Sequence, residues 1–78
     1  MTKLRRDRWT STRPGTALYL SGHDHGHGAR TWSGTLREIG VDLDGKQCFV
    51  LHDGPVTVMV PFEAVAWGLR RSAASAST

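Results

Sequence analysis

The chain has 78 residues, of which 38% are hydrophobic, and a formal net charge of +3 at pH 7. This length predicts one domain with a small core, to which a metal ion or self-association would add stability. Cys48 is the single cysteine, which excludes a disulfide within the chain. A lone cysteine without a signal-peptide pattern indicates a reducing, cytoplasmic setting. No apolar run approaches the ~20 residues that span a bilayer, so no membrane contact is expected.

The charges are unevenly distributed along the sequence. Residues 1–13 carry five bases against one acid, residues 14–69 carry three bases against six acids, and residues 70 and 71 are both arginine. Arginine outnumbers lysine eight to two, which is typical of a GC-rich genome such as that of a bacterium or phage. The few apolar residues of the two ends predict a flexible basic arm over 1–13 and a disordered tail over 72–78. The folded domain is then expected over 14–71.

The first predicted strand covers residues 16–21, where Leu18 and Leu20 share one face and Ala17 and Tyr19 share the other. Residues 22–29 (GHDHGHGA) contain three glycines and no apolar side chain larger than alanine. This composition predicts a mobile loop.

Residues 30–43 are predicted to form a long, bent strand. The apolar alternation changes phase within it, and the two sets are Trp32, Gly34 and Leu36, then Ile39, Val41 and Leu43. Such a phase change turns side chains to the wrong face unless a bulge absorbs one residue. We place this bend near Arg37 and Glu38, with Gly40 easing the curvature. Strongly bent strands are needed to close small barrels.

Three further strands follow. Asp44-Gly45 predicts a two-residue hairpin turn, after which residues 46–52 have apolar side chains on both faces and are expected to form a central strand. Residues 56–60 alternate with a period of two, and Pro61 ends that strand. Residues 65–69 are predicted as a fifth strand, with Val65, Trp67 and Leu69 facing inward. A helix over 62–71 is the alternative, although Gly68 disfavours it.

The predicted fold is therefore all-β, a small, strongly bent, five-stranded barrel. Gly34-x-Leu36 followed by Leu43, with Met59-Val60 and Ala64-Val65 further on, resembles the two motifs of the Sm-like family over residues 16–69. A generic SH3-like barrel fits this order of elements as well. The Sm-like resemblance implies RNA binding and self-association through strand edges.

The sequence departs from the Sm-like motifs at the positions by which that family contacts RNA. Gly40 stands where the first motif has Asp, and Asp44 stands where it ends in Asn. Phe62 and Glu63 occupy the positions of the Lys-His pair of the bacterial second motif. The resemblance therefore implies the scaffold and not the family's RNA-reading pocket.

Two local patterns suggest chemistry. His23, His25 and His27 alternate, so in an extended segment all three could face one metal ion, although ordering a glycine-rich segment opposes this and a solvated loop is the alternative. Cys48 and His52 lie four residues apart on one strand, roughly 13 Å at ~3.3 Å per residue, which is too far for proton transfer. We therefore expect no enzyme activity and no cofactor.

The basic arm is the best candidate for a nucleic-acid contact. Its cations could neutralise phosphates, and Trp9 could stack on an exposed base. The candidate residues are Lys3, Arg5, Arg6, Arg8, Trp9, Arg13, Arg70 and Arg71. Three functions are thus open: a homo-oligomeric binder of RNA or single-stranded DNA, a module that binds or inhibits a protein partner through strand edges, and a small metal-binding protein.

Overall fold

The computed structural model describes residues 2–24, 26 and 28–71, and these form one antiparallel sheet with the strand order β1-β6-β2-β3-β4-β5. Its strands and 3₁₀ turns are β1 (Thr2–Leu4), η1 (Arg6–Arg8), β2 (Ala17–Asp24), β3 (Gly28–Val41), β4 (Gln47–Asp53), β5 (Val56–Pro61), η2 (Phe62–Ala64) and β6 (Val65–Arg71). The all-β prediction is confirmed. The predicted count of five strands is wrong, because the N-terminal residues add a sixth strand beside β6. The sheet is not closed, and β1 and β5 are its two edges.

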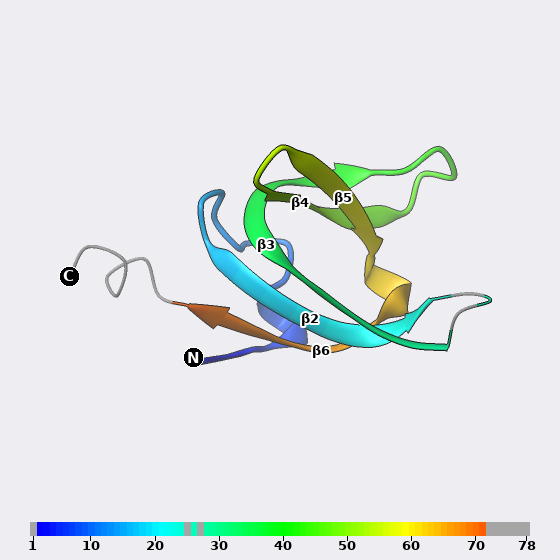
Figure 1. The fold of residues 1–78 in the computed structure, drawn as a ribbon, viewed down its shortest axis with the longest axis horizontal. Coiled ribbons are helices and arrows are strands. Elements are labelled where there is room, and N and C mark those ends of the chain that lie inside the picture. Colours follow the sequence, from blue (N-terminus) through cyan, green and yellow to red (C-terminus); the bar gives the residue numbers. More distant parts are fainter. Residues whose placement is uncertain (1, 25, 27, 72–78) are drawn as a thin grey trace.

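Strand β3 bends where the sequence predicts it. Leu36 lies opposite Leu51 and Glu38 lies opposite Val50, so Arg37 is an extra residue in the ladder between β3 and β4. A bulge of this kind bends the strand and increases its twist. The curved β3 carries the β4–β5 hairpin back over β2 and β6, so that the sheet covers itself (Figure 1).

The β2–β3 hairpin extends into the segment that was predicted to be a loop. Residues 22–24 belong to β2 and residues 28 and 29 to β3, so the prediction of a loop over 22–29 is wrong for these residues. Gly22 is needed for close approach, because a Cβ there would lie 1.7 Å from the carbonyl oxygen of Ala64. The glycine that suggested mobility is thus a packing requirement.

The turn between β3 and β4 is longer than the predicted two residues. The Asp42 carboxylate Oδ1 accepts hydrogen bonds from the backbone N–H groups of Asp44 and Lys46, both at 2.9 Å, and so closes a loop over 42–46. An aspartate that bonds the backbone two residues ahead is a common way to build a turn. Leu43 lies in this loop and is fully exposed, so the strand predicted over residues 30–43 ends earlier than predicted, at Val41.

Strand β4 is the centre of the core, as predicted. Phe49 and Leu51 are completely buried on one face, and Cys48 and Val50 are buried on the other. The main core cluster contains Leu4, Trp9, Leu18, Leu20, Trp32, Leu36, Phe49, Leu51, Val60 and Val65.

The N-terminal segment belongs to this core, which corrects the prediction of a flexible arm. Leu4 is 3% exposed and Trp9 is 2% exposed. The Trp9 ring packs edge-on against Phe49 and Phe62, with centroids 5.4 and 5.2 Å apart, and its indole N–H donates to the Leu4 carbonyl at 3.3 Å. Both large apolar residues among the described part of this segment, Leu4 and Trp9, are therefore buried. The tail predicted over 72–78 lies outside the described residues.

The last segment is a strand and not a helix. Residues 62–64 make the single turn η2, and β6 then pairs with both β1 and β2. Val65 is buried as predicted. The rest of β6 does not keep the predicted alternation of side chains, and this determines which of its residues are exposed.

Candidate functional site

Aromatic and basic side chains share the outer face of β1, β6 and β2. In the strand registers, Lys3 lies opposite Leu69, which lies opposite Tyr19, and the next residues along β6 on this face are Trp67 and Arg71. The neighbouring positions Leu4, Gly68 and Leu20 are buried, so they face the core and this row faces outward. We call the set of Lys3, Tyr19, Trp67, Leu69 and Arg71 the Tyr19–Trp67 face.

Two aromatic rings form the centre of this face. The Tyr19 and Trp67 rings have centroids 6.0 Å apart with an angle of 36° between their planes. Trp67 is 44% exposed, and Tyr19 is half-buried. The sequence pattern correctly placed Tyr19 on the face of its strand that does not carry Leu18 and Leu20, but it did not identify Tyr19 as a site residue.

The prediction that Trp67 faces inward is wrong because β6 contains an irregularity. Ser21 pairs with Trp67, whereas the next residue of β2, Gly22, pairs with Val65, which leaves Ala66 as an extra residue. The bulge reverses the side-chain alternation between Val65 and Trp67. Gly68 then takes the inward position, where a Cβ would lie 2.8 Å from the Leu20 Cδ2 methyl. The sequence carries no local signal of this reversal, because the bulge depends on how β6 pairs with β2.

A hollow of about 400 Å³ lies next to Trp67 at the edge of the sheet. We call it the basic hollow, and it is lined by Lys3, Leu4, Arg5, Arg6, Asp7, Trp9, Ala66 and Trp67. Trp67 and Lys3 belong both to this hollow and to the Tyr19–Trp67 face. The two surfaces are therefore continuous.

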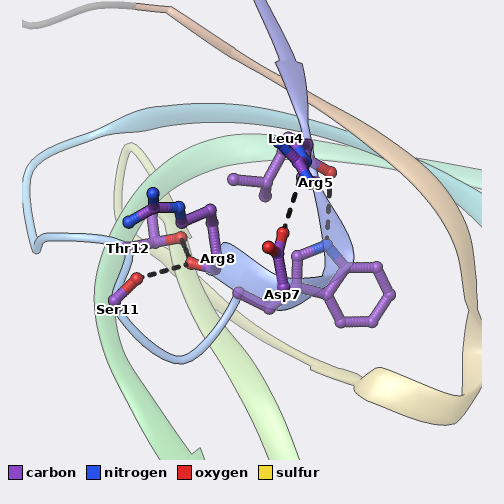
Figure 2. Close-up of polar contacts among 7 residues, drawn as sticks. Leu4, Arg5, Asp7, Arg8, Ser11 and Thr12 are labelled. Atoms are coloured by element: carbon purple, nitrogen blue, oxygen red, sulfur yellow. Dashed lines mark hydrogen bonds and ion pairs between the residues drawn. The ribbon is translucent and has the colours of Figure 1, made fainter.

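The arginines of the basic hollow are differently restrained. The Arg6 guanidinium lies 4.3 Å from the Trp9 ring centroid and donates to the Val65 carbonyl at 3.4 Å, so it is fixed against the core. Arg5 forms an exposed ion pair of 3.5 Å with Asp7 (Figure 2), a pair that water largely screens. Three cations and one carboxylate thus surround the hollow.

The remaining candidate residues are only partly brought together. Arg70 pairs with Leu18 and so points to the opposite side of β6 from Arg71. Arg8 and Arg13 are exposed but are not among the residues that line the basic hollow. In Figure 2 the Ser11 and Thr12 hydroxyls donate to the Arg8 carbonyl, which fixes the turn after η1. The predicted role of Trp9 as a base-stacking residue is wrong, because its ring is buried.

Asp7 is the one carboxylate at the basic hollow, and none of the six acids of residues 14–69 lines that hollow or belongs to the Tyr19–Trp67 face. Asp42 and Asp44 belong to the β3–β4 turn, which lies at the end of the molecule opposite the N-terminus (Figure 1). Asp24 and Glu63 are paired with Arg30 and Lys46 at 2.6 and 3.3 Å. The acidic character of residues 14–69 is therefore concentrated elsewhere, and the face around Trp67 is positive.

The predicted metal site is not assembled among the described residues. His23 is exposed near the end of β2, while His25 and His27 lie outside the described residues. Within the described ranges, no three His, Cys, Asp or Glu side chains are close enough to hold a metal ion.

Cys48 is buried on β4, and His52 is exposed near the end of the same strand. Burial, with a further contribution from the Asp42 carboxylate, raises the pKa of the Cys48 thiol above its ordinary value. The thiol is thus kept protonated and away from solvent, as expected of a small apolar core residue. Within the part of the chain that the structure describes, no helix has the length and apolar character needed to cross a membrane.

Comparison with known proteins gave no relative for this surface or for the fold. No protein-family model matches the chain, and no curated protein or solved structure matches it either.

Proposed function

We propose that the protein is a non-enzymatic binder of single-stranded nucleic acid, RNA or single-stranded DNA. The observation that supports this is the exposed Trp67 ring beside Tyr19, with Lys3 and Arg71 on the same face and Arg5 and Arg6 in the adjoining hollow. Aromatic rings on a sheet surface with cations around them are the usual platform for unpaired bases and their phosphates.

Each part of the surface has a separate task in this proposal. A base stacks on the exposed Trp67 ring, which is worth about 1–3 kcal/mol per base. Lys3 and Arg71 contact the phosphates on either side of it, and the basic hollow receives the continuing backbone. Neither carboxylates nor amide side chains lie on the Tyr19–Trp67 face to read base edges, so we expect little sequence preference.

The architecture proposed with this function is a small barrel of the SH3-like or Sm-like kind, opened at one side. Its support is the strand order β6-β2-β3-β4-β5, the bulged and bent β3, and the single 3₁₀ turn before the last strand. The surface used here differs from the RNA pocket that the Sm-like resemblance implies. The function rests on the Tyr19–Trp67 face and not on that resemblance.

The experiment that tests this function is a fluorescence-anisotropy titration of labelled single-stranded RNA and DNA oligonucleotides at several salt concentrations. The logarithm of the affinity should fall linearly with the logarithm of the salt concentration, because phosphate binding releases counterions. Trp67→Ala should weaken binding about 5- to 150-fold, the equivalent of one lost stack. Trp67→Phe keeps an aromatic face and should restore most of the affinity.

The two lysines of the chain provide a matched charge control. Lys3→Ala should lower the salt slope by about 0.7, the value for one phosphate contact on a single strand. Lys46→Ala removes the same charge at a residue outside both surfaces, where it is paired with Glu63, and should leave the slope unchanged. Binding that is independent of salt, or equal loss in both lysine variants, would refute the proposal and favour a protein partner.

A further inference from the structure

The second open edge of the sheet, strand β5, has features that a solitary edge strand seldom keeps. No other strand among the described residues pairs with its outer side. Its sequence, VTVMVP, contains no charged residue, and Val56 and Met59 are 56% and 53% exposed. Proteins usually protect such edges with lysine, bulges or short strands, since unpaired backbone groups attract another strand.

The opposite edge is protected in this way. Strand β1 has only three residues, carries Lys3, and covers the outer side of β6 from Gly68 to Arg70. A ring that joins β5 of one copy to β6 of the next would therefore need an edge that is already occupied. Strand β5 remains as the edge that is free to pair.

Pro61 determines which backbone groups of β5 point outward. It is the last residue of β5 to pair with β4. Because proline has no N–H to donate, it must occupy a position whose backbone groups point away from β4. Positions alternate in an antiparallel ladder. The N–H and C=O groups of Thr57 and Met59 share this direction and therefore point outward from the sheet.

We propose that two copies of the chain pair through β5, antiparallel and about a two-fold axis at Val58. In this register Thr57 of one copy lies opposite Met59 of the other, so each outward N–H and C=O of both residues gains a partner. Val56 lies opposite Val60, and Pro55 lies opposite Pro61. Because neither proline has an N–H, pairing ends at both ends of the strand.

The alternative register centred on Met59 is less favourable. It places Thr57 opposite Pro61, which has no N–H to donate to the Thr57 carbonyl. An unpaired carbonyl in an interface costs about 1–3 kcal/mol. The two-fold at Val58 is thus the register in which β5 is complementary to itself, and the symmetry closes the assembly at two copies.

There is also space for the partner strand. A hollow of about 340 Å³ adjoins the β5 edge. It is lined by Thr57, Val58, Met59 and Pro61 of β5 and, beyond this strand, by apolar and charged side chains: Trp32, Ala64, Asp24, Arg30 and Glu63. Val56 and Val58 of the added strand would lie beside this hollow, whereas Val60 stays in the core of its own copy. A strand of six residues, ~20 Å long, offers a small interface, so we expect a micromolar and reversible dimer.

Sedimentation equilibrium from micromolar to millimolar protein tests this pairing. The wild-type mass should rise from 8.5 kDa toward twice that value. Thr57→Pro, which removes one outward N–H without touching the β4 ladder, and Met59→Lys should keep the mass of the monomer. Val41→Lys is the matched control for Met59→Lys, because Val41 is also an exposed apolar residue but lies on β3, and it should dimerise like the wild type.

The register has an independent test that does not depend on the folding of those variants. Val58→Cys should form an intermolecular disulfide rapidly on oxidation, since two residues facing each other across a non-hydrogen-bonded pair are ~4.5 Å apart at Cα. Val41→Cys should not. A wild-type mass that stays at 8.5 kDa, a mass above the dimer, or equal cross-linking of both cysteine variants would overturn the proposal.

Discussion

Replacing Trp9 with alanine tests whether the N-terminal segment is part of the fold. The ring is 2% exposed and packs on Phe49 and Phe62, so its removal leaves a cavity between two strands and a turn. Large-to-small substitutions of this kind cost about 3–5 kcal/mol. At about 0.05–0.15 kcal/mol per residue, a chain of 78 residues has ~4–12 kcal/mol in total. The variant should lose a large part of that free energy of unfolding.

The assay is urea unfolding followed by far-ultraviolet circular dichroism, with Trp67→Ala as the matched control. Trp67 is 44% exposed, and its loss should change the free energy of unfolding by under about 1 kcal/mol. Trp9→Phe keeps an aromatic ring and should fall between the wild type and Trp9→Ala. A free energy for Trp9→Ala within ~0.5 kcal/mol of the wild type would mean that the segment is a flexible arm.

Three further outcomes are expected. Gly22→Ala should lower the free energy of unfolding by about 3 kcal/mol or more, because its Cβ would lie 1.7 Å from a backbone oxygen. Gly40→Ala meets only side-chain atoms, of Val50 at 3.0 Å and Cys48 at 3.6 Å, and should cost less in the same urea assay. Asp42→Ala should lower the free energy of unfolding, followed by thermal unfolding, by about 1–2 kcal/mol, because it removes the acceptor of two backbone hydrogen bonds. Asp42→Asn keeps an acceptor and should stay near the wild type. Equal losses in the two variants would show that these two hydrogen bonds contribute nothing. The raised pKa of Cys48 favours the folded state at neutral pH and below, so the free energy of unfolding should fall as the pH rises above the ordinary thiol pKa. Cys48→Ser should flatten that decline. Fast alkylation of the native thiol at neutral pH would contradict its burial.

The features that could be predicted from the sequence are those encoded over a few residues. The phase change between Leu36 and Ile39 indicates a bulge whatever the rest of the chain does, and the structure places it at Arg37. The apolar side chains on both faces of residues 48–51 likewise predict a central strand. In both cases the physical cause, side-chain alternation against a buried face, is local.

The features that were missed depend on partners far away in the sequence. Leu4 and Trp9 look like isolated apolar residues in a basic segment, since the groups that bury them, Gly68, Phe49 and Phe62, lie at least 40 positions later. The glycine-rich composition of residues 22–29 indicates mobility, but Gly22 is glycine because Ala64 approaches it. Composition reports the absence of a side chain and not the reason for it.

The candidate site was predicted only in part. The excess of bases near the N-terminus suggested Lys3, Arg5 and Arg6 as binding residues, and these three side chains line one hollow. Its aromatic residue was misassigned, because the bulge at Ala66 turns Trp67 outward while Val65 stays buried. A bulge in β6 requires knowledge of how β2 pairs with it, and that pairing joins residues more than 40 positions apart.

The pairing of the first strand with the last has a consequence for the order in which the chain folds during synthesis. The strand β1 needs residues 68–70, Trp9 needs Phe49 and Phe62, and Arg6 bonds the Val65 carbonyl. The β2–β3 and β4–β5 hairpins join neighbouring segments and can form as they leave the ribosome. Strand β1 is made before β6 and must wait for it, and contacts of such long sequence separation slow folding. The residues of β1 are therefore expected to reach their place after the two hairpins have formed.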